Sequence, residues 1–517
     1  MTWHRDRAMT TIAAGTSRLA PTYDVVVIGL GVTGAGVALD AVSRGLSVLA
    51  VDAHDLAFGT SRWSSKLVHG GLRYLAHGQV GVAHESAVER GILMETTAPH
   101  LTHPLPMLLP LTSSVSAPQA VLARSGFVAG DLLRRGARTA RETLPRPRRI
   151  SATEALALAP ALRSAGLRGG LLSWDGRLED DARLVTTIAR TAADLGAEVR
   201  TRAAVVSATG TRVVLRDART GAERAVGARA VVNATGVWAG GLDPDVTLRP
   251  SRGTHAVLRA DTLPGLQTAV TAPVPGSTSR FVLVLPQPDG TVYVGLTDEP
   301  VDGPVPDVPV PTEPEIGFLL DVVSASFAHD LRRSDVVGAY AGLRPLLDTG
   351  GGSTADLSRR HAVLTSTTGV VTVVGGKLTT YRRMAEDAVD RVVDQSRLDA
   401  APCRTRTLPL AGAASRHDLA RLEVHPRLVR RFGADAPLVL ENARRVTGLG
   451  DDELLAPVDD RVPATLAELV FGVTHEGAVD VDDLLDRRTR VGLVPADRER
   501  ALPAARRALA LAAVDET

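Results

Sequence analysis

Cysteine is almost absent from this sequence, since Cys403 is the single cysteine among 517 residues. One thiol can form no disulfide within the chain, and it cannot build a metal site that needs several cysteine ligands. We therefore expect no metal site, and the composition fits a reducing, cytoplasmic location.

Aromatic residues and net charge are also scarce, at 3% of the chain and +1 respectively. Few aromatic side chains are available to stack on bases, and no excess of positive charge favours a polyanion, so nucleic acid is not expected as a partner. No run approaches the roughly 18 apolar residues of a membrane-spanning helix. With 44% hydrophobic residues, the chain is long enough for two or three globular domains.

The most informative stretch is residues 23–53, which reads as strand, tight turn, helix and strand. Gly29, Gly31 and Gly34 have the GxGxxG spacing, which lets a pyrophosphate approach the backbone at a helix N-terminus. Asp52 ends the second strand, where an acid accepts hydrogen bonds from a ribose hydroxyl. The stretch predicts dinucleotide binding, and the alternative is a structural unit whose glycines serve packing alone.

Two later segments repeat the pattern of a strand followed by small residues. Residues 229–240 give an apolar strand and a turn, and residues 370–384 give a strand, a glycine pair and a helix start. Between the first turn and these segments, residues 59–77 are rich in small, hydroxyl and basic groups, and we expect a helix that begins at Ser64 and Ser65. Such a helix start would face an anion, or it would simply be an ordinary capped helix.

The pattern along the chain predicts an α/β protein with a Rossmann-like dinucleotide-binding domain, an antiparallel-sheet substrate domain and a C-terminal helical domain. The first domain is discontinuous, and we expect a disordered N-terminal tail. The expected ranges are 1–20 for the tail; 21–100, 160–244 and 340–398 for the first domain; 101–159 and 245–339 for the second; and 405–517 for the third.

Residues 121–149 carry eight arginines against two acidic residues, with apolar residues interleaved. This pattern is typical of a basic amphipathic helix that lies on anionic lipid. The alternative is a solvated basic face.

Several long motifs resemble those of the FAD-dependent glycerol-3-phosphate dehydrogenases, within the superfamily of glycine oxidase and D-amino-acid oxidase. TSRWSSKLVHGGLRYL is similar to the family's flavin signature, and GGKLTTYR at 375–382 to its second signature. GLRPL, RGTH, DDARLV and RRTRVGL also resemble family stretches. The sequence departs from the family pattern at Asp52, often Glu, at Trp63, usually small, and at Thr254, usually Ser.

The resemblance implies FAD as cofactor and oxidation of sn-glycerol 3-phosphate at C2 to dihydroxyacetone phosphate, with hydride transfer to flavin N5. It places cofactor contacts in the motifs above: Gly29, Gly31, Gly34, Asp52, Thr60, Ser61, Ser64, Ser65, Lys66, Ala234, Thr235, Gly236, Gly375, Gly376, Lys377, Leu378 and Thr379.

The substrate's phosphate needs cations, and the arginines at matching positions are Arg73, Arg344 and Arg359, with Tyr74 beside the first. His255 is the candidate base for the C2 hydroxyl proton, because an unperturbed imidazole titrates near the working pH. Lys377 is the rival catalytic group, since a cation there would stabilise a reduced flavin. We assign His69 to the flavin side or to structure.

The resemblance implies a quinone acceptor reached from the cytoplasmic face of the membrane through peripheral contact. A single cysteine argues against an attached iron–sulfur domain, so the chain is similar to the single-subunit aerobic type. The alternatives are an oxidase that uses O₂ and a non-catalytic flavin-binding protein at the membrane surface. The sequence leaves the oligomeric state open, a homodimer included.

Overall fold

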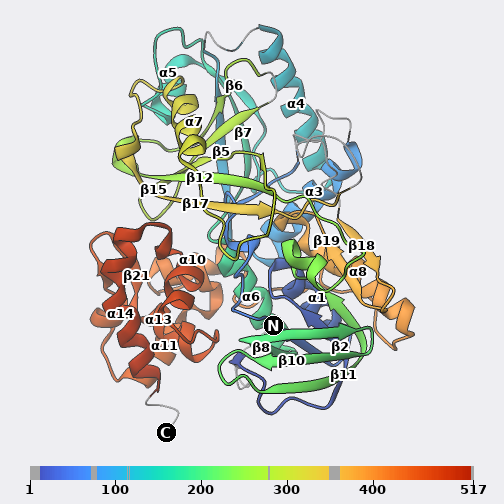
Figure 1. The fold of residues 1–517 in the computed structure, drawn as a ribbon. Coiled ribbons are helices and arrows are strands. Elements are labelled where there is room, and N and C mark those ends of the chain that lie inside the picture. The colour runs from blue at the N-terminus through green and yellow to red at the C-terminus, as the bar shows by residue number, and fades with distance from the viewer. Residues whose placement is uncertain are drawn as a thin grey trace.

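The structure is a computed structural model that describes residues 12–71, 79–112, 115, 117–277, 280–348 and 361–513. Figure 1 shows three parts: one sheet with helices at the lower right, a second sheet above it, and a group of helices at the lower left. The α/β fold with an antiparallel-sheet part and a C-terminal helical part is confirmed.

The first sheet has nine strands within the described residues. Strand β2 pairs in parallel with β3 and β11, and β11 pairs in parallel with β19, which places helices on the sheet faces. The strands are β1 (Ala13–Ala14), β2 (Thr22–Ile28), β3 (Val48–Val51), β8 (Glu198–Thr201), β9 (Ala203–Thr209), β10 (Arg212–Asp217), β11 (Glu223–Asn233), β18 (Ala362–Thr365) and β19 (Val371–Val374).

The second sheet has ten strands in the described part of the chain and is mainly antiparallel. Its longest pairings are β12 with β17 and β5 with β7. The strands are β4 (Leu67–Val68), β5 (Thr102–Pro110), β6 (Arg148–Ile150), β7 (Gly170–Leu178), β12 (Ser251–Arg259), β13 (Ala269–Pro273), β14 (Phe281–Pro286), β15 (Thr291–Gly295), β16 (Glu299–Pro300) and β17 (Val336–Arg344).

Helices cover both sheets and form most of the C-terminal part. The C-terminal helices surround a small hairpin of β20 (Pro457–Asp459) and β21 (Val462–Thr465). The helices are α1 (Val32–Ser43), α3 (Val80–Ile92), α4 (Ala117–Gly136), α5 (Ala152–Leu158), α6 (Asp181–Asp194), α7 (Glu313–Ser324), α8 (Tyr381–Ser396), α9 (Arg416–Leu419), α10 (Pro426–Phe432), α11 (Ala436–Thr447), α12 (Asp451–Leu455), α13 (Leu466–Thr474) and α14 (Pro495–Ala513).

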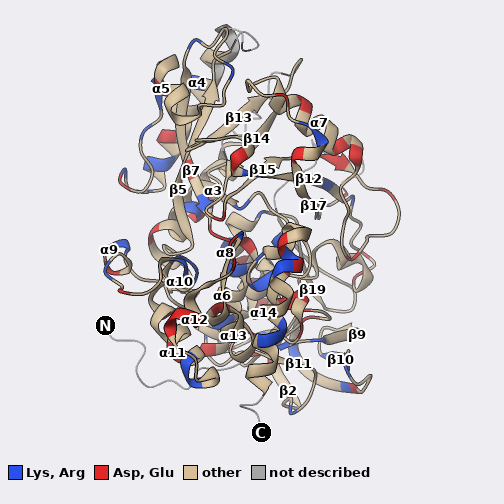
Figure 2. Cartoon of the chain, turned by 90° about the vertical axis from the view of Figure 1, so that its left-hand side faces the viewer, with Lys and Arg blue, Asp and Glu red and all other residues tan. Residues whose placement is uncertain are grey.

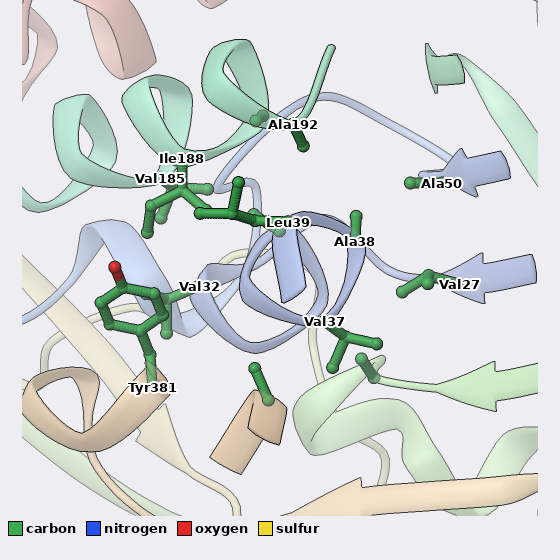
Figure 3. Packing of buried hydrophobic residues seen from close by; sticks show 14 of the residues in the cluster. Val27, Val32, Val37, Ala38, Leu39, Ala50, Val185, Ile188, Ala192 and Tyr381 are labelled. Carbon is green, nitrogen blue, oxygen red and sulfur yellow. The ribbon is translucent and has the colours of Figure 1, made fainter. Parts of the chain in front are cut away.

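Helix α1, which follows the glycine turn, is buried between α6 and α8. Figure 3 shows Leu39 of α1 beside Val185 and Ile188 of α6, and Tyr381 at the start of α8 near Val32. Burial of each such side chain contributes about 1.5–3 kcal/mol. The helix that begins at the glycine turn is therefore fixed on both sides by the core.

The N-terminal segment differs from the expected disordered tail. Strand β1 pairs in parallel with β8, and the side chains of Ile12 and Leu19 are buried. Strand β1 extends the first sheet by one strand and the two apolar side chains are buried beside it, so residues 12–20 belong to the fold. Residues 1–11 lie outside the described part of the chain.

The boundaries between the two sheets also differ from those expected. Strand β7 lies in the range 160–244 assigned to the first domain, yet it pairs along its length with β5 of the second sheet. Strand β11 begins at Glu223, before the apolar strand expected from residue 229, and runs unbroken to Asn233. Local alternation of apolar residues predicts that a strand forms, but it does not say which sheet the strand joins.

Helix α4 lies in the basic segment and presents apolar side chains to solvent. Val121, Val128 and Leu132 are each more than half exposed. Arg134 is different, because its side chain is buried and donates hydrogen bonds to Asp131 and to the carbonyl of Thr139. Arg134 therefore does not belong to the exposed basic face of α4. Its side chain instead bonds groups at the C-terminal end of the helix.

Charges elsewhere are mixed, and Figure 2 shows basic and acidic residues side by side on the C-terminal helices. Within the described residues, no helix has the length and apolar character required to cross a membrane.

Candidate functional site

The glycine turn between β2 and α1 forms a tight cradle. A Cβ at Gly34 would lie 1.8 Å from the carbonyl oxygen of Gly29, and one at Gly29 would lie 2.8 Å from the carbonyl oxygen of Ala234. Gly29 also has a φ of +94°, which favours glycine. The turn at Ala234 and Thr235 therefore packs directly on the glycine turn, so the structure brings these two predicted segments together.

The start of α1 is open to an anion. Gly31 is the N-cap residue and provides no side-chain hydrogen bond, and the first turn contains no acidic residue. The amide of Val32 donates to Ser61 Oγ over 2.9 Å, which brings the hydroxyl-rich segment to the helix N-terminus. Unsatisfied amides at a helix N-terminus with small neighbouring residues fit a pyrophosphate.

Asp52 lies at the end of β3 and joins it to the glycine turn. Its carboxylate accepts hydrogen bonds from the amides of Leu30, at 2.7 Å, and His54, at 2.8 Å. Burial raises the pKa of Asp52 despite these bonds. Each carboxylate oxygen has a second lone pair, so the group retains capacity to accept a bond from a ribose hydroxyl.

Ser64 and Ser65 do not begin a helix, in contrast to the prediction. A 3₁₀ turn spans Thr60–Arg62 and is followed by an irregular segment that leads into β4. Lys66 has a φ of +54°, which breaks helical geometry. The amide and the hydroxyl of Ser64 both bond Asp181, so they are not directed at an open anion site.

Lys66 is a buried cation rather than a solvent-facing one. Its Nζ lies 2.9 Å from Asp181 Oδ2, donates to the carbonyl of Arg62, and sits 4.8 Å from the centre of the Tyr340 ring. Burial lowers the pKa of Lys66, opposed by the negative charge of Asp181. Lys66 thus fixes its own segment through Asp181, and its Nζ is engaged by the protein.

His255 lies on β12, buried against the same segment. Its Nε2 is 2.8 Å from Ser65 Oγ, its ring stacks on Tyr340 with centroids 4.7 Å apart, and a Cβ at Gly295 would lie 2.2 Å from its Cδ2. Nδ1 is buried and has no hydrogen-bond partner among the described residues. Burial, followed by the charges of Lys66 and Arg344, lowers the pKa of His255 well below its usual value. The imidazole is therefore neutral.

Arg344 ends β17 beside β12, as the sequence predicts for that strand. Its guanidinium donates to Ser251 Oγ, to Asp298 and to the carbonyl of Thr297. Asp298 lies 3.2 Å from Arg344 Nη1 and also accepts a hydrogen bond from Ser251. These contacts hold the planar fork in one orientation near His255, whose pKa its charge affects.

Lys377 precedes the short 3₁₀ turn Leu378–Thr380 that leads into α8. Its Nζ donates to Ser86 Oγ of α3 over 2.7 Å. A cavity of about 330 Å³ lies here, lined by Gly81, Val82, Glu85, Ser86, His361, Lys377 and Thr380.

His69 lies near this helix start, because its amide donates to Thr379 Oγ1 over 3.2 Å. Gly375 and Gly376 both have positive φ, at +77° and +75°. The hydrogen bond between His69 and Thr379 places the GGKLTTYR motif beside His69 of the flavin signature. Arg73, Tyr74 and Arg359 lie outside the described residues.

Three segments therefore converge in space: the glycine turn, the Thr60–Lys66 segment and the Gly375–Thr380 turn. Ser61 contacts the start of α1, whereas Ser65 contacts His255. A long, extended dinucleotide fits this arrangement, since its pyrophosphate would lie at the α1 N-terminus and its ring end near His255.

Comparison with known proteins identifies the family of the chain. The sequence model of the family described as FAD dependent oxidoreductase matches residues 24–382, and the model described as the C-terminal domain of alpha-glycerophosphate oxidase matches residues 403–514. The chain belongs to the family of FAD-dependent oxidoreductases. FAD is its cofactor, as the resemblance implied.

Two relatives of this flavoprotein come from Mycobacterium tuberculosis. Glycerol-3-phosphate dehydrogenase 1 is 54% identical over 490 residues, covering 93% of this chain and 94% of the relative. Glycerol-3-phosphate dehydrogenase 2 is 37% identical over 494 residues, covering 91% and 81%. Among solved structures, a glycerol-3-phosphate dehydrogenase from Bacillus halodurans complexed with FAD has a TM-score of 0.71 at 28% identity and covers 95% of this chain and 91% of its own.

Sequence reasoning missed the partners that hold the site residues. Asp181 fixes the Ser64–Lys66 segment, Tyr340 stacks on His255, and Asp298 orients Arg344. The DDARLV stretch contains Asp181, but it signals only a helix start. Tyr340 follows from strand register, which pairs it with His255, and Asp298 immediately precedes β16, which pairs with the start of β12.

Proposed function

We propose that this flavoprotein oxidises sn-glycerol 3-phosphate at C2 to dihydroxyacetone phosphate. The observation that carries the proposal is the 54% identity, over nearly the full length of both chains, to a protein named glycerol-3-phosphate dehydrogenase. The placement of His255 and Arg344 on adjacent strands supports it, because the substrate needs a proton acceptor and an anion-binding group close together.

The substrate's phosphate is bound by Arg344, and by Arg73 and Arg359 with Tyr74. Arginine suits this role since its planar fork donates two parallel hydrogen bonds to phosphate oxygens. Asp298 holds the guanidinium of Arg344 in place, and its negative charge offsets the positive charge of that group. Arg344 alone therefore neutralises little of the charge of a phosphate dianion. Several cations are therefore required.

His255 accepts the proton of the C2 hydroxyl. In a neutral imidazole, only the ring nitrogen that carries no hydrogen can accept a proton. The hydrogen bond between Ser65 Oγ and Nε2 helps to determine which nitrogen that is. The approaching phosphate dianion raises the pKa of the ring and strengthens it as a base. FAD, when bound, accepts the two electrons removed from C2.

The electron acceptor is a quinone in this proposal, and the protein reaches it by peripheral contact with an anionic membrane. The exposed apolar residues Val121, Val128 and Leu132 on α4, with the exposed Arg124 and Arg135 on the same side, favour this contact. The rival acceptor is O₂, which would make the protein an oxidase.

Steady-state assays of purified holoprotein test the proposal. We expect oxidation of glycerol 3-phosphate with a soluble quinone and little peroxide release, and much slower turnover of glycerol, which lacks the phosphate. Rapid peroxide formation in air would assign the oxidase activity instead. Flavin that no glycerol 3-phosphate concentration reduces would favour a non-catalytic flavin-binding protein.

A further inference from the structure

Two adjacent buried carboxylates, Asp180 and Asp181, stand between the C-terminal helices and the flavin site. We propose that Arg431 of α10 acts through this pair as a positioning residue, which fixes the Ser64–Lys66 segment and with it His255. The C-terminal helical part would then be needed for tight FAD binding.

Asp181 fixes the Ser64–Lys66 segment of the flavin site through hydrogen bonds. Its Oδ2 accepts hydrogen bonds from the amide of Ser64 at 2.9 Å, the hydroxyl of Ser64 at 2.7 Å and Nζ of Lys66 at 2.9 Å. The side chains of Asp181 and Lys66 are each 1% exposed. In addition, the carbonyl of Lys66 accepts from the amide of Leu178. Both ends of the segment thus depend on residues just before α6.

The second step leads from this segment to the site. Ser65 lies between the two residues that Asp181 holds, and its Oγ is 2.8 Å from His255 Nε2. Tyr340, which stacks on His255, donates its hydroxyl hydrogen to the carbonyl of Ser64. A shift of the Ser64–Lys66 backbone would therefore displace both contacts that orient the His255 ring.

The third step leads from Asp180 to the C-terminal helices. Arg431 Nη2 is 3.0 Å from Asp180 Oδ2, and both side chains are fully buried. Asp180 also caps α6, because its Oδ1 accepts from the amides of Ala182 and Arg183. Its charge acts on Lys66 as well, opposing the effect of burial on the Lys66 pKa. Asp180 thus joins Arg431 of α10 to the start of α6, and its charge acts on Lys66.

Loss of Arg431 would leave the Asp180 carboxylate buried without its ion-pair partner, and only the more distant charges of Arg490 and Lys66 would still act on it. Such a change is strongly unfavourable, and the charge is accommodated only if the protein relaxes or takes up a proton. The start of α6 is where that relaxation must occur. Because Asp181 is the next residue, its bonds to Ser64 and Lys66 would weaken.

Helix α10 offers a matched control for this effect. Arg427 lies one turn before Arg431, is buried, and bonds the same acceptor, Glu468, at 2.6 Å. Only Arg431 of the two bonds Asp180. Arg427→Met and Arg431→Met therefore remove the same group from the same helix, and they differ in two bonds of Arg431, one to Asp180 and one to the carbonyl of Arg488.

The test is the dissociation constant of FAD, measured by quenching of flavin fluorescence on titration with apoprotein, with no substrate present. We expect Arg431→Met to weaken FAD binding by about tenfold or more, and Arg427→Met by less than about threefold. Asp181→Asn should weaken it as much as Arg431→Met. Far-UV circular dichroism shows that each variant is folded. If Arg431→Met does not fold, Arg431→Lys against Arg427→Lys decides by the same criterion.

Rescue separates positioning from general damage. The double variant Arg431→Met/Asp180→Asn removes the buried charge and keeps a helix-capping side chain. We expect its FAD affinity to return toward that of the wild type. Equal FAD affinity in the Arg431 and Arg427 variants, or no recovery in the double variant, would overturn the proposal. Neither result bears on which substrate is oxidised, because the titration contains none.

Discussion

His255 is the base in the proposed reaction, and its imidazole is buried and neutral. Burial and the charges of Lys66 and Arg344 lower its pKa, so it is ready to accept a proton without first losing one. Ser65 and Tyr340 hold its ring, and Gly295 leaves room for it. The residue is thus both oriented and in the protonation state that a base requires.

His255→Gln should slow the reduction of bound flavin by glycerol 3-phosphate by about a hundredfold, since general-base catalysis commonly contributes this much. Stopped-flow absorbance under anaerobic conditions measures the rate. The exposed His329 provides the control, and His329→Gln should react as the wild type does. A wild-type rate in His255→Gln would move the role of base to Lys377.

Arg344→Ala should raise the KM for glycerol 3-phosphate by about a hundredfold, because a charge-assisted bidentate contact is lost. Arg344→Lys keeps the charge and loses the fork, so its KM should fall between the two. Steady-state kinetics with an artificial acceptor give both values. An unchanged KM in Arg344→Ala would remove this residue from the phosphate site.

Among the secondary-structure elements, helix α4 contains part of the basic segment 121–149 and is partly exposed to solvent. The sequence predicts a basic amphipathic helix, and the structure has a helix from Ala117 to Gly136. The side chain of Arg134 is buried, however, so it does not contribute to the exposed face. Only Val121, Val128 and Leu132, with their exposed basic neighbours, remain for lipid contact.

Replacement of Val121, Val128 and Leu132 by Ser, with Arg124→Glu and Arg135→Glu, should release the protein from anionic liposomes while dye-linked activity is kept. The loss follows from removal of both the apolar area and the attraction to lipid charge. Vesicle flotation measures binding. A variant with Arg421→Glu and Arg506→Glu should bind as the wild type does, since both residues are exposed, Arg421 in the turn after α9 and Arg506 on α14. Equal flotation of the α4 variant would leave α4 as a solvated face.

The elements that the sequence predicts well are those with a local signal. The glycine turn, α1 and the helix start at DDARLV follow from spacing and capping residues alone. The Ser64–Lys66 segment does not, because its shape depends on Asp181, more than a hundred residues away. Assignment of β7 to a sheet likewise depends on a distant partner.

At the scale of the whole molecule, buried histidines make stability dependent on pH. Burial lowers the pKa of His100 to about 3 and that of His103 and His475 to about 4. The unfolded chain binds protons at these groups near pH 6.5, before the folded protein does. Stability is therefore complete above pH 6.5 and is lost as the pH falls toward 4, by about 1.4 kcal/mol per pH unit for each histidine.

His100→Leu should reduce this loss. Neither ring nitrogen of His100 has a hydrogen-bond partner in the described part of the chain. Replacement by an apolar side chain of similar size therefore breaks no such hydrogen bond and costs little stability. Thermal unfolding between pH 7.5 and about 5 should show a smaller fall in Tm for the variant than for the wild type. The exposed His417 supplies the control, and a variant slope equal to that of His417→Leu would contradict the account.

The central claim is that this flavoprotein takes electrons from glycerol 3-phosphate, and anaerobic reduction of its bound flavin tests that claim most directly. Purified holoprotein is mixed with glycerol 3-phosphate in the absence of oxygen and of any acceptor, and the visible absorbance of the flavin is followed. The account predicts rapid bleaching that saturates with substrate concentration and is absent with glycerol. Flavin that remains oxidised with glycerol 3-phosphate, yet is bleached by dithionite, would contradict it.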